Sequence, residues 1–122
     1  MGKFIRSIEK GARLDIFKYT KLTVECVMRE STMTVFLKGY LSFESVLELR
    51  KKCKSCLADA AIKEIVLNLS DVKSIDSLSL GFLLELRENA HLANKTPLLA
   101  SISRSVKSKF EIANFDRLFA IV

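Results

Sequence analysis

An apolar run followed by a helical pattern constrains the fold of this chain most. Residues 62–69 read Ile-Lys-Glu-Ile-Val-Leu-Asn-Leu, a short and largely apolar run that is typical of a strand in the middle of a sheet covered by helices. Residues 78–94 then show helical spacing, with one apolar stripe about 100° wide. That stripe consists of Phe82, Leu83, Leu86, Ala90 and Ala93. A buried strand that leads into a core-facing helix indicates an α/β fold.

The junction between that strand and that helix holds the polar residues best placed for a function. Asp76 and Ser77 stand where the strand becomes the helix, and either side chain can cap the unpaired N–H groups of a helix start. The same N–H groups, with the partial positive charge of the helix end, would suit a phosphate on Ser77. We therefore expect the function of the chain to lie at this junction.

Two leucines of the same helix fall outside its core-facing stripe. Leu80 and Leu84 share a face with Arg87 and His91, near the Ser77 end of the helix. Either a neighbouring helix covers these leucines, or they form an exposed patch that binds a partner.

The N-terminal third of the domain has the pattern of a hairpin. Residues 22–29 and 32–40 are rich in β-forming residues, and Glu30 and Ser31 join them without the glycine that such turns favour. Gly39, near the end of the second strand, suggests a bulge or a close approach of another backbone segment.

Further elements complete an alternating order. Ser42 suits the N-cap of a helix that runs to about residue 60. The last third adds a strand at 97–102, a helix from Ser103 or Ser105 to about residue 113, and a short strand at 119–122. The order ββαβαβαβ predicts a single α/β domain over residues 21–122, with a mixed sheet of about four to five strands and helices packed on it.

Composition and charge describe an ordinary globular domain with a basic N-terminal extension. The 122 residues suffice for one core, and no run approaches the roughly 18 apolar residues of a membrane span. The net charge is +6, of which residues 1–21 carry +4. No nucleic-acid motif accompanies this charge, so nucleic-acid binding is not expected. No export signal is visible either, which indicates a cytoplasmic protein.

The basic extension, residues 1–20, permits two interpretations. Five apolar residues recur at roughly helical spacing with basic residues on other faces: Phe4, Ile5, Ile8, Ala12 and Ile16. An amphipathic helix of this kind could bind a membrane surface or a partner. Alternatively, the extension packs on the domain or frays in solution, which is favoured because Gly11 interrupts the pattern.

No constellation of residues points to an enzyme, a metal or a cofactor. Cys53 and Cys56 form a C-x-x-C pair, but they lie in mid-helix on an apolar stripe, which indicates core packing. Cys26 leaves an odd number of cysteines, which does not suit a disulfide framework. The single histidine, His91, is expected about 20 Å along its helix from Ser77, which excludes a catalytic triad. Glycine-rich phosphate-binding motifs are also absent from the sequence.

Residues 21–122 resemble the STAS domain family of bacterial anti-sigma-factor antagonists. The resemblance rests on the order of elements, on Gly39, on the strand ending Asn68-Leu69-Ser70-Asp71-Val72, and on Ile75-Asp76-Ser77-x-x-Leu80-Gly81. The family motif is typically Asp-Ser-(Ser/Thr)-Gly-Leu-Gly. Here Leu78 replaces the second hydroxyl residue and Ser79 replaces the first glycine.

The resemblance implies a switch that acts through a partner protein. In the family, an unphosphorylated Ser or Thr at the helix start allows binding to an ATP-using anti-sigma kinase, and phosphorylation by the kinase abolishes that binding. Ser77 is then the candidate phosphorylation site, with Ser79 as a minor alternative. If the kinase requires the second hydroxyl position, Ser77 is only a helix cap.

The same resemblance implies a partner-binding surface around the helix start. Its expected residues are Asp76, Ser77, Leu78, Leu80, Gly81, Leu84 and Arg87. The alternative implied by the family is a STAS scaffold that is not phosphorylated, such as the small subunit of a lipid-transport complex, with the basic extension near a membrane.

Overall fold

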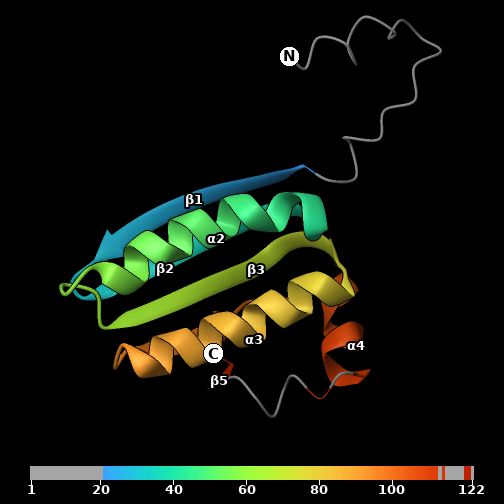
Figure 1. Ribbon diagram of the computed structural model, residues 1–122. Helices are drawn as coiled ribbons and strands as arrows, with labels where there is room; N and C mark the ends of the chain where they lie inside the picture. The colour runs from blue at the N-terminus through green and yellow to red at the C-terminus, as the bar shows by residue number, and fades with distance from the viewer. Residues whose placement is uncertain (1–20, 113, 115–119, 122) are drawn as a thin grey trace, which may run out of the picture.

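A computed structural model describes residues 21–112, 114, 120 and 121 as a five-stranded sheet with helices (Figure 1). The strands are β1 (Leu22–Arg29), β2 (Thr32–Leu41), β3 (Glu64–Ile75), β4 (Thr96–Ala100) and β5 (Ala120–Ile121). The helices are α2 (Phe43–Ala58), α3 (Ser77–Leu92) and α4 (Arg104–Ile112). The predicted α/β class and the order ββαβαβαβ are confirmed. The interpretations of residues 1–20 lie outside the described residues.

The sheet is mixed, and its order follows the chain. β1 and β2 pair antiparallel, whereas β2, β3, β4 and β5 pair in parallel, in the order β1-β2-β3-β4-β5. Each parallel connection contains one helix. Figure 1 shows α2 and α3 side by side over one face of this sheet.

The hairpin has the two-residue turn that the sequence predicted. Glu30 takes the left-handed conformation that glycine usually supplies, with φ of 57°. Gly39 has φ of 113°, and a Cβ atom there would collide with the carbonyl oxygen of Lys21. The pairing of β2 with β3 also shifts register between Gly39 and Tyr40. Gly39 therefore marks both an irregular strand and a close backbone approach, as expected.

One hydrophobic core fills the space between the sheet and the helices. The strands contribute alternate residues, and α2 and α3 contribute the apolar stripes that the sequence predicted. Its buried members include Val35, Leu37, Ile65, Leu67, Leu99, Leu49, Cys53, Cys56, Phe82, Leu83 and Leu86. Burial, with a smaller effect of the neighbouring cysteines, raises the pKa of the Cys53 thiol to about 12. Cys53 and Cys56 are thus packing residues in this structure.

Several predicted boundaries were wrong: β3 begins at Glu64 and not at Ile62, β4 ends at Ala100 and not at Ile102, and two further differences are larger. β3 continues to Ile75 instead of ending at Leu69, because its second half pairs with the end of β2 and buries Val72 and Ile75. α3 ends at Leu92, so Ala93 is an exposed C-cap residue and not a member of the core stripe. Polar residues in the second half of β3 conceal the longer strand in the sequence.

Polar contacts also join the two long helices. Arg50 of α2 forms a salt bridge of 2.8 Å with Glu85 of α3, and its guanidinium lies 5.5 Å from the centroid of the Phe82 ring. Both charged side chains are about half exposed, so the pair contributes at most about 1 kcal/mol to stability. The pair adds a polar contact to the core packing that holds α2 against α3.

The described part of the chain has neither a candidate membrane-spanning helix nor a candidate metal-binding cluster. No helix there is long and apolar enough to cross a membrane. Nor does any group of three or more His, Cys, Asp or Glu side chains there lie close enough to hold a metal ion.

Candidate functional site

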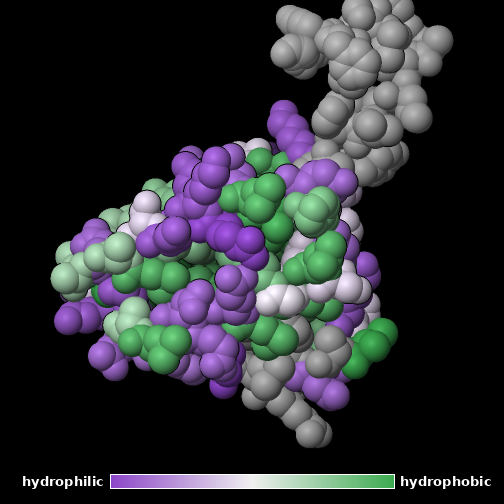
Figure 2. Space-filling view, in the orientation of Figure 1, coloured by the Kyte–Doolittle hydropathy of each residue, from purple (hydrophilic) through white to green (hydrophobic). Residues whose placement is uncertain are grey.

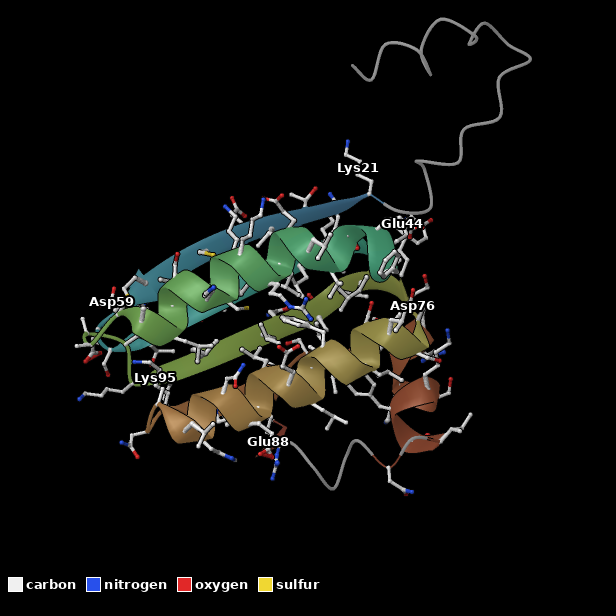
Figure 3. All side chains as sticks on the ribbon, in the orientation of Figure 1. Lys21, Glu44, Asp59, Asp76, Glu88 and Lys95 are labelled. Atoms are coloured by element: carbon white, nitrogen blue, oxygen red, sulfur yellow. The ribbon has the colours of Figure 1, made fainter. Side chains whose placement is uncertain are left out.

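One carboxylate caps the starts of two helices. Asp76, the N-cap residue of α3, accepts a hydrogen bond from the Ser79 amide through Oδ1 at 2.8 Å. Its other oxygen, Oδ2, accepts a hydrogen bond from the Phe43 amide at the start of α2, at 2.9 Å. Figure 3 labels Asp76 at this end of α3, with Glu44 of α2 nearby. Asp76 therefore holds the two helix starts together.

The surroundings of Asp76 favour its ionised form. Burial alone would raise the pKa of this carboxyl group, but hydrogen bonds from Ser79 and Phe43, with the positive charge of Lys109, outweigh burial and lower it. Lys109 is itself held near the junction, because its ammonium donates a hydrogen bond of 2.7 Å to the Ile75 carbonyl. A charged Asp76 is the stronger acceptor for both amides.

The two candidate phosphorylation sites differ in exposure. Ser77 is the first residue of α3 and is exposed to solvent. Ser79 is completely buried, with its amide bonded to Asp76. In this conformation a kinase could reach the hydroxyl of Ser77 but not that of Ser79.

Exposed apolar side chains surround the start of α3. Leu78 is 62% exposed, and the neighbouring start of α2 adds Phe43 and Leu47 at 55% and 52%. Phe43 and Leu47 are one helical turn apart and so share a face of α2. Figure 2 shows apolar side chains gathered over this end of the molecule. We call Phe43, Leu47, Ser77 and Leu78 together the Ser77 surface.

The other predicted partner-binding residues differ in solvent exposure and in their distance from Ser77. Gly81 is exposed, on the second turn of α3. Leu80 and Leu84 are half-buried and pack against the core. The fold therefore partly covers these two leucines, although they lie outside the core-facing stripe of α3. Arg87 lies ten residues after Ser77, about 15 Å along the helix. The structure thus brings Asp76, Ser77, Leu78 and Gly81 together and leaves Arg87 apart.

Sequence reasoning missed the contribution of α2. Phe43 precedes Asp76 by 33 residues, and only their hydrogen bond reveals that they are neighbours. One signal was present in the sequence, because Phe43 and Leu47 fall outside the apolar stripe that contains Val46 and Leu49. An apolar pair outside the core stripe indicates either a covered face or a binding surface.

Comparison with solved structures gives several similar folds. An anti-sigma factor antagonist from Mycobacterium paratuberculosis is 16% identical with a TM-score of 0.74, covering 83% of this chain and 85% of that one. The protein TM1081 of Thermotoga maritima is 24% identical with a TM-score of 0.73, covering 80% and 84%. The phosphorylated form of SpoIIAA, a Bacillus cell fate determinant, is 18% identical with a TM-score of 0.65, covering 82% and 91%. At these identities the likeness shows a shared fold.

A family model covers nearly the whole of the described domain. The STAS domain model matches residues 23–122, from the start of β1 to the end of the chain. The match spans the hairpin, the sheet and the Asp76–Ser77 junction. This chain belongs to the STAS domain family.

Proposed function

We propose that this chain is an anti-sigma factor antagonist whose Ser77 surface binds an anti-sigma factor with serine kinase activity. In this proposal the unphosphorylated domain binds the partner, and phosphorylation of Ser77 prevents binding. The similarity of the fold to a mycobacterial anti-sigma factor antagonist and to SpoIIAA, which has a phosphorylated form, supports this class of function.

The observation that carries the proposal is an exposed hydroxyl between exposed apolar side chains. Ser77 lies beside Leu78 and close to the start of α2, where Phe43 also faces solvent. Burial of apolar surface is the main favourable contribution to most protein–protein association. A chemical change at Ser77 would therefore fall inside the interface.

Phosphorylation of Ser77 would alter this surface without unfolding the domain. A phosphate adds about −1.5 to −2 charges, which the N–H groups and partial positive charge of the α3 start can accommodate. A partner that packs on Phe43 and Leu78 would have to bury that charge against apolar groups, which is costly. The expected result is a stable domain that no longer binds.

A second function is favoured by one observation, the exposure of Leu78. The family motif has a hydroxyl residue at this position, and here a leucine is 62% exposed beside Ser77. An additional exposed leucine suits a surface that is permanently covered. In this alternative the chain is a STAS scaffold subunit, such as that of a membrane lipid-transport complex, and Ser77 only begins the helix.

Phosphate transfer separates the two functions. The protein is incubated with ATP and the anti-sigma kinases encoded in the same genome, and its intact mass is measured. The switch predicts one added phosphate on the wild type and on Ser74→Ala, but none on Ser77→Ala. Ser74 is a matched control because it is exposed three residues earlier, on the preceding strand. If no kinase adds phosphate to the wild type, the switch is refuted and the scaffold is favoured.

Partner capture tests the apolar surface itself. Leu78→Asp should weaken binding of the unphosphorylated domain by about 10- to 100-fold, because a buried leucine contributes about 1.5–3 kcal/mol. Leu92→Asp is the control, since Leu92 lies at the other end of α3 and is 82% exposed. Both affinities are measured by calorimetry with the captured partner. If Leu78→Asp and Leu92→Asp bind equally well, Leu78 lies outside the interface.

A further inference from the structure

A second apolar surface lies on the face of the sheet opposite α2 and α3, which we call the outer face. Val35 and Leu37 of β2 are buried beneath the helices, so the alternate residues Thr34 and Phe36 point to the other side. Paired residues of neighbouring strands share a face. The register therefore aligns one row across four strands, Val27, Thr34, Val66 and Leu98.

The outer face carries exposed and half-buried apolar side chains among its polar residues. Val27 is 42% exposed and Phe36 is 39% exposed, while Val66 and Leu98 are half-buried. An open hollow of about 420 Å³ at the hairpin end brings Val27 and Phe36 together with polar residues, namely Arg29, Glu30, Ser31, Thr32 and Thr34. Three of the four side chains in the row are apolar, and their contact with water is unfavourable unless another group covers them.

None of the described helices covers this row. α2 and α3 pack on the opposite side, through the core residues of the sheet. α4 and the residue before it bond to the second half of β3, at the carbonyls of Leu69, Val72 and Ile75. These contacts lie beyond Val66, so the row remains without a helix from the described part of the chain.

The chain itself supplies a segment of suitable length and pattern. Residues 1–20 lead directly into β1 at Leu22, on the edge of the sheet. As a helix, the apolar stripe from Phe4 to Ile16 would be about 18 Å long. Four strands are about 14 Å wide and the eight residues of β1 are about 26 Å long, so the stripe fits within the outer face.

We propose that residues 1–20 form an amphipathic helix that docks on the outer face of the sheet of the same molecule. Ile8 and the other apolar residues of the stripe cover Val27, Phe36 and Val66, and the basic residues face solvent. The proposal does not depend on the Ser77 surface, because that surface is formed by the helices on the other side of the sheet.

Limited trypsin digestion of the full chain tests docking from the side of the sheet. Cleavage after Lys10 and Arg13 should be roughly tenfold slower in the wild type than in Val27→Asp, because a buried apolar contact of this size changes the undocked population by that factor. Leu47→Asp is the control, since Leu47 is similarly exposed but lies on α2. Equal cleavage rates in all three proteins would overturn the proposal.

Thiol labelling tests docking from the side of the extension. In a Thr34→Cys protein, the new thiol should react slowly with iodoacetamide, and adding Ile8→Asp should accelerate that reaction roughly tenfold. Adding Leu14→Asp should not, because Leu14 lies outside the apolar stripe. Peptide mass spectrometry separates this thiol from the native cysteines, and circular dichroism confirms that each variant is folded. Fast labelling of the protein whose only substitution is Thr34→Cys would overturn the proposal.

Two other occupants of the outer face give different results in the same assays. If a second copy covers the outer face, light scattering shows a dimer, and protection of Thr34→Cys falls on dilution. If residues 1–20 bind a membrane instead, protection from trypsin appears only when phosphatidylglycerol vesicles are present. Either result would overturn docking within one molecule. Protection that is independent of protein concentration and of vesicles supports it.

Discussion

Replacement of Gly81 by alanine should stabilise the domain, although Gly81 belongs to the motif at the candidate site. Gly81 is exposed in the interior of α3, and a Cβ atom built on it would have no neighbour within 4 Å. Because no contact opposes the added methyl group, helix propensity decides the sign of the effect. Alanine is favoured over glycine by about 1 kcal/mol in a helix interior.

The expected gain is large enough to measure by urea unfolding followed by circular dichroism. With an m-value of about 1–3 kcal/mol/M, a gain of about 1 kcal/mol raises the midpoint by about 0.3–1 M. The melting temperature should rise by about 3–6 °C for a domain of this size. An unchanged m-value would show that the effect is on stability and not on the extent of the unfolded state.

Gly39→Ala provides a matched contrast. Gly39 has a φ of 113°, and its new Cβ would collide with the carbonyl oxygen of Lys21, so this variant should lower the midpoint. If Gly81→Ala also lowered the midpoint, the reasoning about α3 would be refuted. A stabilised Gly81→Ala that nevertheless captured its partner less well would show that the methyl group obstructs docking, since loss of folding could not explain the result.

Three further experiments test individual side chains. The pKa of Asp76 is lowered in the folded state, so its carboxylate stabilises the fold above about pH 4. This contribution is lost as the pH falls through the folded-state pKa. The loss of unfolding free energy in Asp76→Asn, measured by urea unfolding, should therefore be smaller in acid than at neutral pH. Iodoacetamide at neutral pH should label exposed Cys26 in the folded protein and spare Cys53 and Cys56, as intact mass before and after unfolding would show. Lys95→Met should lower the unfolding free energy by about 1–3 kcal/mol, because the buried ammonium donates hydrogen bonds of 2.8 and 2.6 Å to two main-chain carbonyls between α2 and β3.

Local patterns were sufficient for most of the fold. The hairpin, the N-cap at Ser42 and the strand-to-helix junction at Asp76 follow from residues adjacent in sequence, and the structure confirms them. The extension of β3 to Ile75 did not follow, because it depends on pairing with β2 and not on the hydrophobicity of β3 itself. Polar residues can occupy a strand wherever a neighbouring strand supplies hydrogen-bond partners.

The candidate site also contains some features that local sequence patterns predict and others that depend on distant contacts. Ser77 could be identified from its position at a helix start, and helical spacing also predicts the burial of Ser79, although the family motif alone does not distinguish the two hydroxyl residues. Ser79 points into the core since it lies three residues before Phe82 and shares its face of α3. The neighbouring Phe43 depends on the contact between α2 and α3, which no local pattern specifies.

That contact connects the chemistry of Ser77 to a surface made by two helices. Asp76 is adjacent to Ser77 and holds the Phe43 amide and the Ser79 amide with its two oxygens. A phosphate on Ser77 would place a second negative charge beside this carboxylate and compete for the N–H groups at the start of α3. Any weakening of the Asp76–Phe43 bond would release the start of α2 and with it part of the Ser77 surface. The proposed phosphorylation would then act both by adding charge between apolar side chains and by loosening the contact that positions them.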